Sequence, residues 1–312
     1  MEFVTSRLRA ALAATASVAF ATTAVLLAPA VAPAATLDLG TRAATTPGLV
    51  VDPDTLAPPG ANDFACRPSS LRPYPVVLVP GTFESMAKNW STLSPVLADA
   101  GYCVFALNYG ETNGVYATGP IEISAQELSL FVNKVLKSTK ARKVAIVGHS
   151  QGGMMPRQYL RFEGGTSKVR SLVGIAPSNH GTEGLITPAP DGTGAPSGND
   201  ACVACDQQQA GSPFLQRLNK GGDLVGGTTG PFYTVISTQY DEVVTPYQSQ
   251  FLVGPASRVT NILIQDVCPT DLIEHDQAPN DPVVHQLVLE ALSHNSGPAD
   301  PAPRVDCTPI AP

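Results

Sequence analysis

The chain has 312 residues and a formal net charge of −7, with 14% charged and 43% hydrophobic residues. An acidic chain without clustered Lys and Arg is a poor candidate for binding nucleic acid or an anionic membrane surface, because phosphate recognition needs concentrated positive charge. The length suits one large α/β domain or two smaller ones, and we favour one.

The amino-terminal segment is typical of an export signal. Arg7 and Arg9 form a basic start, an alanine-rich apolar stretch covers residues 10–27, and overlapping small-residue cleavage sites end at Ala34. An uncleaved membrane anchor is the alternative, but many positions of the stretch are Ala or Thr instead of Leu or Ile. We therefore predict a signal peptide over residues 1–34 and a secreted, extracellular mature chain with no integral membrane segment.

Six cysteines form an even set in an exported chain, which predicts disulfides. Sequence alone permits many pairings. The order along the chain favours three of them: Cys66 with Cys103, Cys202 with Cys205, and Cys268 with Cys307. The C-x-x-C spacing of the middle pair also occurs in redox and zinc sites, but no further metal ligands lie nearby in the sequence. We expect neither a metal nor an organic cofactor.

We predict that the remaining chain consists of a lead-in followed by one catalytic domain. Residues 35–65 are rich in Pro, Thr, Ala and Gly, so we expect an extended lead-in, with a disordered tail up to Gly60 as the alternative. Short apolar runs in the domain over residues 66–312 predict strands at 76–79, 102–107, 144–147, 169–175, 232–237 and 259–264. Helical patterns occur at 86–100, 123–138, 154–162, 214–219 and 282–292. Strands that alternate with helices predict an α/β fold with a mostly parallel sheet covered on both faces.

The run Gly148-His149-Ser150-Gln151-Gly152 lies between a predicted strand and a predicted helix. This G-x-S-x-G pattern is a nucleophile elbow, in which small residues two before and two after the serine allow a sharp turn. The amino end of the following helix would stabilise negative charge beside Ser150. Ser150 is therefore the predicted nucleophile.

The loop Pro80–Ser85 follows the first predicted strand of the domain. In a hydrolase with this order of elements, that loop supplies one oxyanion N–H, and the residue after the nucleophile supplies a second. These positions are Thr82 and Gln151, and the Thr82 hydroxyl could be a third donor. The alternative is that Thr82 only caps the next helix.

A serine nucleophile needs a histidine base. Of the five histidines, His275 alone lies in a loop after the last predicted strand. His149 adjoins the nucleophile, where we expect its side chain to point away from the active face. His180 is expected to shape the pocket, and a structural or solvated role is expected for His285 and His294.

The base in turn needs an acid that orients it. Asp241 follows the end of a predicted strand, and the order Ser150, Asp241, His275 is the one used by α/β-hydrolases. Asp266 also lies at a strand end, but its closeness to His275 in the sequence favours a local structural role.

Regular patterns break off over residues 176–230, which hold many Gly and Pro and one short helical piece. Long irregular segments of this kind are usually functional. We expect a cap or pocket wall over the carboxyl end of the sheet, and a disulfide-pinned insertion without a role is the alternative.

Three segments of the chain resemble the secreted actinobacterial triacylglycerol lipases of the lipase class 2 group. They are Val77–Phe83, Gly148–Arg157 and Ala176–Gly181. More distantly, the chain is similar to the yeast lipase B type, and the likeness covers most of the chain from about residue 66. It implies an α/β-hydrolase fold and three disulfides, although the Cys202/Cys205 pair is not formed that way in the yeast type.

The resemblance also implies roles for single residues. The family's oxyanion threonine falls on Thr82, the glutamine after the nucleophile on Gln151, and the histidine on His275. The family's acid segment falls on Ser237–Val243 in altered form, with Asp241 in the acid position and one residue inserted before it.

Together these features predict a secreted serine hydrolase that cleaves esters of hydrophobic acyl chains through an acyl-enzyme. Its partner would be a hydrophobic ester or lipid substrate, bound in solution or at a lipid–water interface, and we expect a monomer. An acyltransferase with the same triad is one alternative. A non-catalytic binding module on the same fold is the other.

Overall fold

The computed structural model describes residues 52–184 and 202–308. The expected signal peptide, most of the lead-in and part of the 176–230 insertion lie outside these residues. Within the described ranges, no helix is both long and apolar enough to cross a membrane.

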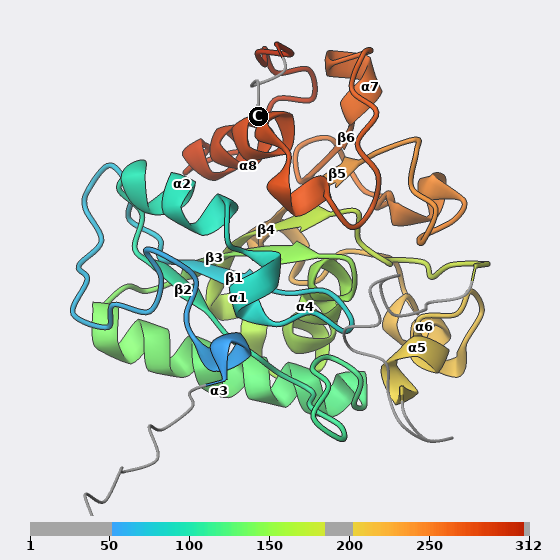
Figure 1. Ribbon diagram of the computed structural model, residues 1–312, viewed down its shortest axis with the longest axis horizontal. Coiled ribbons are helices and arrows are strands. Elements are labelled where there is room, and N and C mark those ends of the chain that lie inside the picture. Colours follow the sequence, from blue (N-terminus) through green and yellow to red (C-terminus); the bar gives the residue numbers. More distant parts are fainter. Residues whose placement is uncertain (1–51, 185–201, 309–312) are drawn as a thin grey trace, which may run out of the picture. The chain divides into compact units, whose positions relative to one another are not determined.

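A six-stranded sheet forms the centre of the fold, in the order β2-β1-β3-β4-β5-β6 (Figure 1). The strands are β1 Val76–Val79, β2 Val104–Ala106, β3 Val144–His149, β4 Val169–Ile175, β5 Phe232–Ser237 and β6 Val259–Leu263. Every neighbouring pair is parallel, so all six carboxyl ends lie at one edge of the sheet. The continuous apolar runs of β1 and β3 are buried throughout, as expected for parallel strands covered on both faces.

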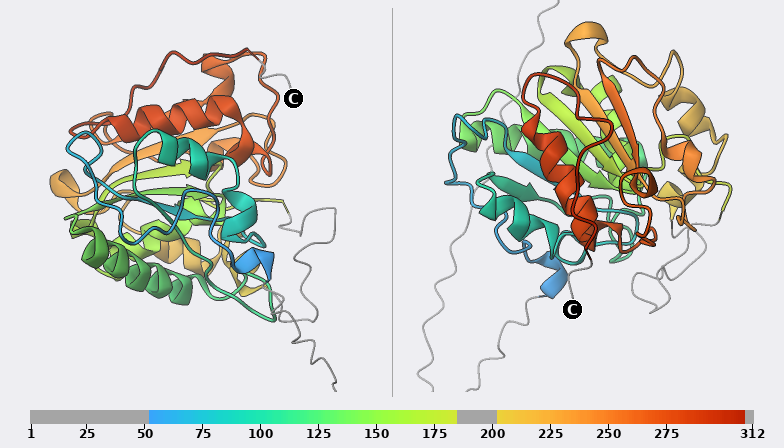
Figure 2. Two further views of the ribbon diagram at one scale, coloured as in Figure 1. Left: turned by 60° about the vertical axis from the view of Figure 1, so that its left-hand side comes forward. Right: turned by 90° about the horizontal axis from the view of Figure 1, so that it is seen from above.

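Helices cover both faces of the sheet (Figures 1 and 2). They are α1 Met86–Asn89, α2 Leu93–Asp99, α3 Ile121–Thr139, α4 Gln151–Phe162, α5 Val203–Gln207, α6 Pro213–Leu218, α7 Ile264–Val267 and α8 Pro282–Ser293. Side chains alternate along β1: Val77 and Val79 join the core with α3 and α4, whereas Val76 and Leu78 join the core with α2 and α8. This two-residue period confirms the predicted α/β arrangement.

The boundaries of two predicted helices were wrong. The stretch predicted as one helix over 86–100 is divided into α1 and α2 at the fully buried Trp90. Ser85 caps α1, since its hydroxyl accepts a hydrogen bond from the Lys88 N–H, so Thr82 is not the cap of this helix. Helix α4 begins at Gln151 instead of residue 154, because it starts directly after the elbow serine.

The described part of the insertion is more regular than predicted. Helix α5 was not expected, and its five residues are too few to produce a helical period in the sequence. Helix α6 agrees with the predicted helical piece. It begins with Ser212 as cap and Pro213 in its first turn, both of which favour helix initiation.

Three disulfides are present, and they are the three predicted pairs. They join Cys66 to Cys103, Cys202 to Cys205, and Cys268 to Cys307. The last bond ties the proline-rich tail to the end of α7.

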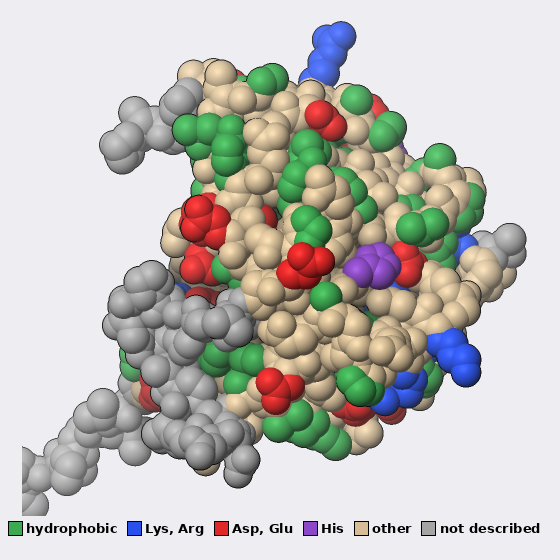
Figure 3. Space-filling view, turned by 90° about the vertical axis from the view of Figure 1, so that its right-hand side faces the viewer, with side chains coloured by type: hydrophobic (Ala, Val, Ile, Leu, Met, Phe, Trp, Pro, Cys, Tyr) green, Lys and Arg blue, Asp and Glu red, His purple; other side chains and the backbone are tan. Residues whose placement is uncertain are grey.

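The face that carries α5 and α6 has a mixed surface (Figure 3). Outside the grey atoms, hydrophobic and acidic side chains are spread over this face, while Lys and Arg side chains lie singly near its margin. The distribution agrees with the acidic net charge of the chain.

Candidate active site

The elbow serine lies at the carboxyl edge of the sheet, between β3 and α4. Its backbone has φ 54° and ψ −123°, a strained conformation that persists only where the surroundings impose it. A Cβ on Gly148 would lie 1.8 Å from the Gly152 carbonyl oxygen, and one on Gly152 would lie 2.1 Å from the Val79 carbonyl oxygen. Both glycines are therefore required for the turn that presents Ser150.

The Ser150 side chain is available for chemistry. The residue is 6% exposed. Within the described part of the chain, its hydroxyl makes no hydrogen bond, and none joins it to His275. Catalytic hydrogen bonds often tighten only in the substrate complex, so this arrangement is compatible with a nucleophile before substrate binds.

His275 and Asp241 form a buried pair. His275 Nδ1 donates to Asp241 Oδ2 at 2.7 Å, and Gln250 Nε2 donates to the same oxygen at 2.7 Å. The other carboxylate oxygen accepts the N–H groups of Val243 and Val244 at 2.9 and 2.7 Å. Because Asp241 holds the proton on Nδ1, Nε2 of His275 is left as the basic nitrogen.

The charge of Asp241 also changes the acidity of His275. Burial alone would lower the pKa of His275, but the charge and hydrogen bond of Asp241 outweigh burial and raise the pKa above the ordinary value for histidine. His275 is therefore a stronger base than a solvated imidazole.

The second candidate acid lies elsewhere. Asp266 is exposed on α7, and no contact joins it to His275 among the residues described. The structure thus brings Asp241, and not Asp266, to the histidine.

Thr82 and Gln151 provide a set of hydrogen-bond donors beside Ser150. The loop that carries Thr82 is close to the nucleophile, since a Cβ on Gly81 would lie 3.3 Å from Ser150 Cβ. Over the described ranges, the backbone N–H groups of Thr82 and Gln151 have no protein acceptor. No protein group therefore competes for the two N–H groups that are predicted to hold an oxyanion.

The Thr82 hydroxyl is oriented by two amides. Its oxygen accepts from Gln151 Nε2 at 2.8 Å and from Gln208 Nε2 at 3.0 Å. With both lone pairs engaged, the hydroxyl hydrogen is left to donate to a substrate. Gln208 follows α5 in the insertion, and no local pattern in the sequence marks it.

Replacing Thr82 with valine should remove one oxyanion donor and keep the shape of the loop. We expect kcat for ester hydrolysis to fall by about a hundredfold to a thousandfold with little change in KM, because the donor acts on charge that develops in the transition state. Steady-state kinetics on a soluble ester measure this. Thr82→Ser should keep most of the rate, and Thr260→Val, which removes a buried hydroxyl bonded to Ala299, is the matched control. An unchanged kcat in Thr82→Val would exclude the hydroxyl from the site.

The structure corrects the expected orientation of His149. Its ring lies beside the ring of His275, with centroids 4.9 Å apart, so it does not point away from the active face. The sequence could not reveal this orientation, because the contact depends on where the fold places the loop that carries His275.

The other three histidines have partners other than His275 and Asp241. His180 lies between the Ser249 carbonyl oxygen, 2.9 Å from Nδ1, and Asp223 Oδ1, 3.0 Å from Nε2. His285 contacts a backbone carbonyl and His294 contacts Glu290 on α8. Among the described residues, no group of three or more His, Cys, Asp or Glu side chains could hold a metal ion.

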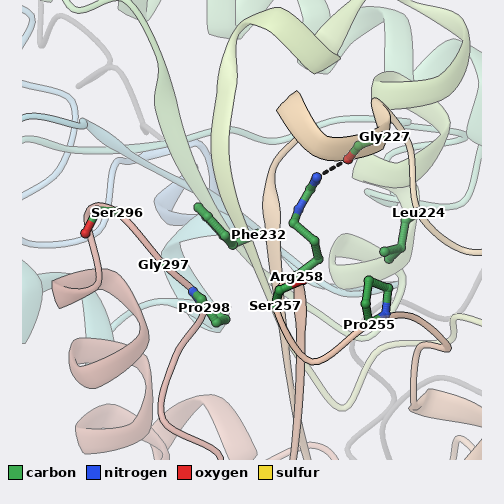
Figure 4. Close-up of a pocket in the computed structure, with 9 residues that line it drawn as sticks. All are labelled: Leu224, Gly227, Phe232, Pro255, Ser257, Arg258, Ser296, Gly297 and Pro298. Atoms are coloured by element: carbon green, nitrogen blue, oxygen red, sulfur yellow. Dashed lines mark hydrogen bonds between the residues drawn. The ribbon is translucent and has the colours of Figure 1, made fainter.

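A cavity of about 530 Å³ lies at the opposite edge of the sheet (Figure 4). Phe232, the first residue of β5, lines it together with Arg258, which donates to the Gly227 carbonyl oxygen. Since Ser150 and Asp241 follow the carboxyl ends of strands, this cavity is separate from the candidate active site.

Comparison with known proteins agrees with the fold. The family model described as Lipase (class 2) matches residues 73–288. Among solved structures, Aspergillus fumigatus lipase B is similar at 23% identity with a TM-score of 0.63, over 79% of this chain and 57% of that one. A Paleococcus ferrophilus monoacylglycerol lipase has 17% identity and a TM-score of 0.49, over 74% of this chain and 97% of that one. At 23% identity the likeness to the Aspergillus lipase shows the fold alone, and this chain spans little more than half the length of that lipase.

Proposed function

Because the chain belongs to the lipase class 2 family, we propose that it hydrolyses carboxylic esters of hydrophobic acyl chains, acylglycerols among them. One observation carries the proposal. Among the described residues, the Ser150 hydroxyl has no hydrogen-bond partner, and it lies beside the Thr82 and Gln151 N–H groups, on the same edge of the sheet as the His275–Asp241 pair. These are the nucleophile, oxyanion donors, base and orienting acid that acyl transfer to serine requires.

The reaction would proceed through an acyl-enzyme. His275 Nε2 takes the proton of Ser150 Oγ as this oxygen attacks the ester carbonyl, and the oxyanion accepts hydrogen bonds from Thr82 and Gln151. His275 then gives the proton to the leaving alcohol. In the second half, His275 takes a proton from water, whose oxygen attacks the acyl-enzyme carbonyl. His275 then returns the proton to Ser150 Oγ as the bond between Oγ and the acyl carbon breaks, which releases the carboxylic acid. Asp241 stays ionised throughout and stabilises the imidazolium.

We also propose that the protein acts outside the cell after removal of residues 1–34. All six cysteines are in disulfides, which form and persist in oxidising compartments. The mass of the protein recovered from culture medium tests this, since a chain that still contains residues 1–34 would contradict it.

The proposed reaction can be tested with p-nitrophenyl esters of increasing acyl length, with and without a dilute alcohol acceptor. We expect turnover that rises with acyl length and yields free carboxylic acid as the main product. A main product in which the dilute alcohol carries the acyl group would indicate an acyltransferase. Absence of any turnover would contradict the proposal and favour a binding module.

A further inference from the structure

A chain of buried hydrogen bonds joins the oxyanion loop to the backbone of His275. The Gly81 N–H donates to Asn89 Oδ1 at 2.8 Å. Asn89 Nδ2 lies 3.2 Å from His149 Nδ1, and His149 Nε2 lies 3.0 Å from the His275 carbonyl oxygen. Asn89 is 5% exposed and His149 is 3% exposed, so water does not compete for these bonds.

The bonds of this chain have one consistent direction. The Gly81 N–H can only donate, so Asn89 Oδ1 accepts and Asn89 Nδ2 must donate to His149 Nδ1. His149 then carries its proton on Nε2, where it faces a carbonyl acceptor. This requires a neutral imidazole. Burial, together with the neighbouring His275, lowers the pKa of His149 well below its ordinary value, which agrees with that state.

The chain connects three parts of the site that are distant in the sequence. Asn89 ends α1, His149 ends β3 next to Ser150, and His275 lies in the loop after α7. Gly81 directly precedes Thr82 and lies against the His149 ring, since a Cβ on Gly81 would lie 3.0 Å from Nδ1, closer than an ordinary contact.

We propose that Asn89 and His149 are positioning residues that hold the oxyanion loop and His275 at a fixed separation on either side of Ser150. The inference rests on the proposed function, because it assigns the two residues to the catalytic machinery without contact to substrate. The His275 carbonyl has a second, longer bond from the Ala278 N–H at 3.3 Å, so the His149 bond is the shorter restraint on this backbone. A displacement of about 1 Å at a reacting group can reduce the rate about a hundredfold.

Asn89→Leu is the sharpest variant, because it keeps a similar side-chain volume but removes both the acceptor for the Gly81 N–H and the donor to His149. We expect kcat to fall by about tenfold to a hundredfold with KM changed by less than about twofold. His149→Phe should have a similar effect. Since both residues act in one chain, the double variant should lose no more than the worse single variant. Asn261 makes the same two-sided amide bonds to the Leu252 backbone, so Asn261→Asp and Asn261→Leu are matched controls with unchanged kcat.

NMR of the chain with ¹⁵N-labelled histidine measures the protonation state of His149. A purely structural role of Asn89 would leave this state unchanged when Asn89 is substituted. In the wild type, His149 should stay neutral with its proton on Nε2 throughout the active pH range. In Asn89→Asp, the carboxylate draws a proton to Nδ1, so His149 should titrate at higher pH.

The possible outcomes separate this inference from the proposed function. Wild-type kcat in folded Asn89→Leu would overturn the inference even if His149→Phe failed to fold. A wild-type His149 with its proton on Nδ1 would overturn it as well. Absence of ester hydrolysis in the wild type would instead overturn the proposed function, whatever the state of His149.

Discussion

Ser150→Ala is expected to lower kcat for ester hydrolysis by about a millionfold, the loss typical of removing a serine nucleophile. The reason is that no other hydroxyl group occupies the turn that faces the Thr82 and Gln151 N–H groups. Stability should change little, since the Ser150 hydroxyl makes no hydrogen bond in the described part of the chain. The melting temperature should therefore stay close to that of the wild type.

Two measurements test this expectation. An organophosphonate should add once to the wild type, on the peptide that contains Ser150, and should not add to Ser150→Ala. Ser124→Ala, which removes a buried hydroxyl bonded to the Pro120 carbonyl, is the matched control and should keep both activity and labelling. Hydrolysis or labelling that persists in Ser150→Ala would show that another residue is the nucleophile.

Asp241→Asn should lower kcat by about ten-thousandfold, as loss of the acid does in serine hydrolase triads. An asparagine could keep one oxygen for the N–H groups of Val243 and Val244. Its NH₂ group would then face His275 Nδ1, which forces the proton to Nε2 and leaves no base toward Ser150. Asp266→Asn, which changes the exposed alternative acid, is the matched control and should retain full activity.

The same variant should change the pH dependence of kcat/KM. His275 acts as a base only when neutral, and Asp241 raises the pKa of His275, so wild-type activity should fall with decreasing pH at a pH above that of an ordinary histidine. Without the charge of Asp241 the pKa of His275 falls, so the acid limb of the residual activity should move to lower pH. If the acid limb of the Asp241→Asn variant lies at the same pH as that of the wild type, a group other than His275 controls the pH dependence.

Local sequence patterns were sufficient to predict the strands, the turn at Ser150 and the cysteine pairs. A strand buried on both faces must be apolar throughout, and this is visible in β1 and β3 without knowledge of their neighbours. The sharp turn at Ser150 similarly requires glycine at two fixed positions. Helix α5 left no such sign, because five residues are too few for a period.

The sequence by itself thus determined the parallel α/β fold and the candidate nucleophile, base and oxyanion loop. Only the tertiary structure decided which acid meets His275, how Thr82 is oriented and which way His149 points. The contacts that decide these points cross 34 residues between Asp241 and His275, 126 between Thr82 and Gln208, and 60 between Asn89 and His149. A single amide or carboxylate that acts across such a distance is not marked by any local sequence pattern. Its role depends on which distant segment the fold places beside it, and not on its neighbours in the sequence.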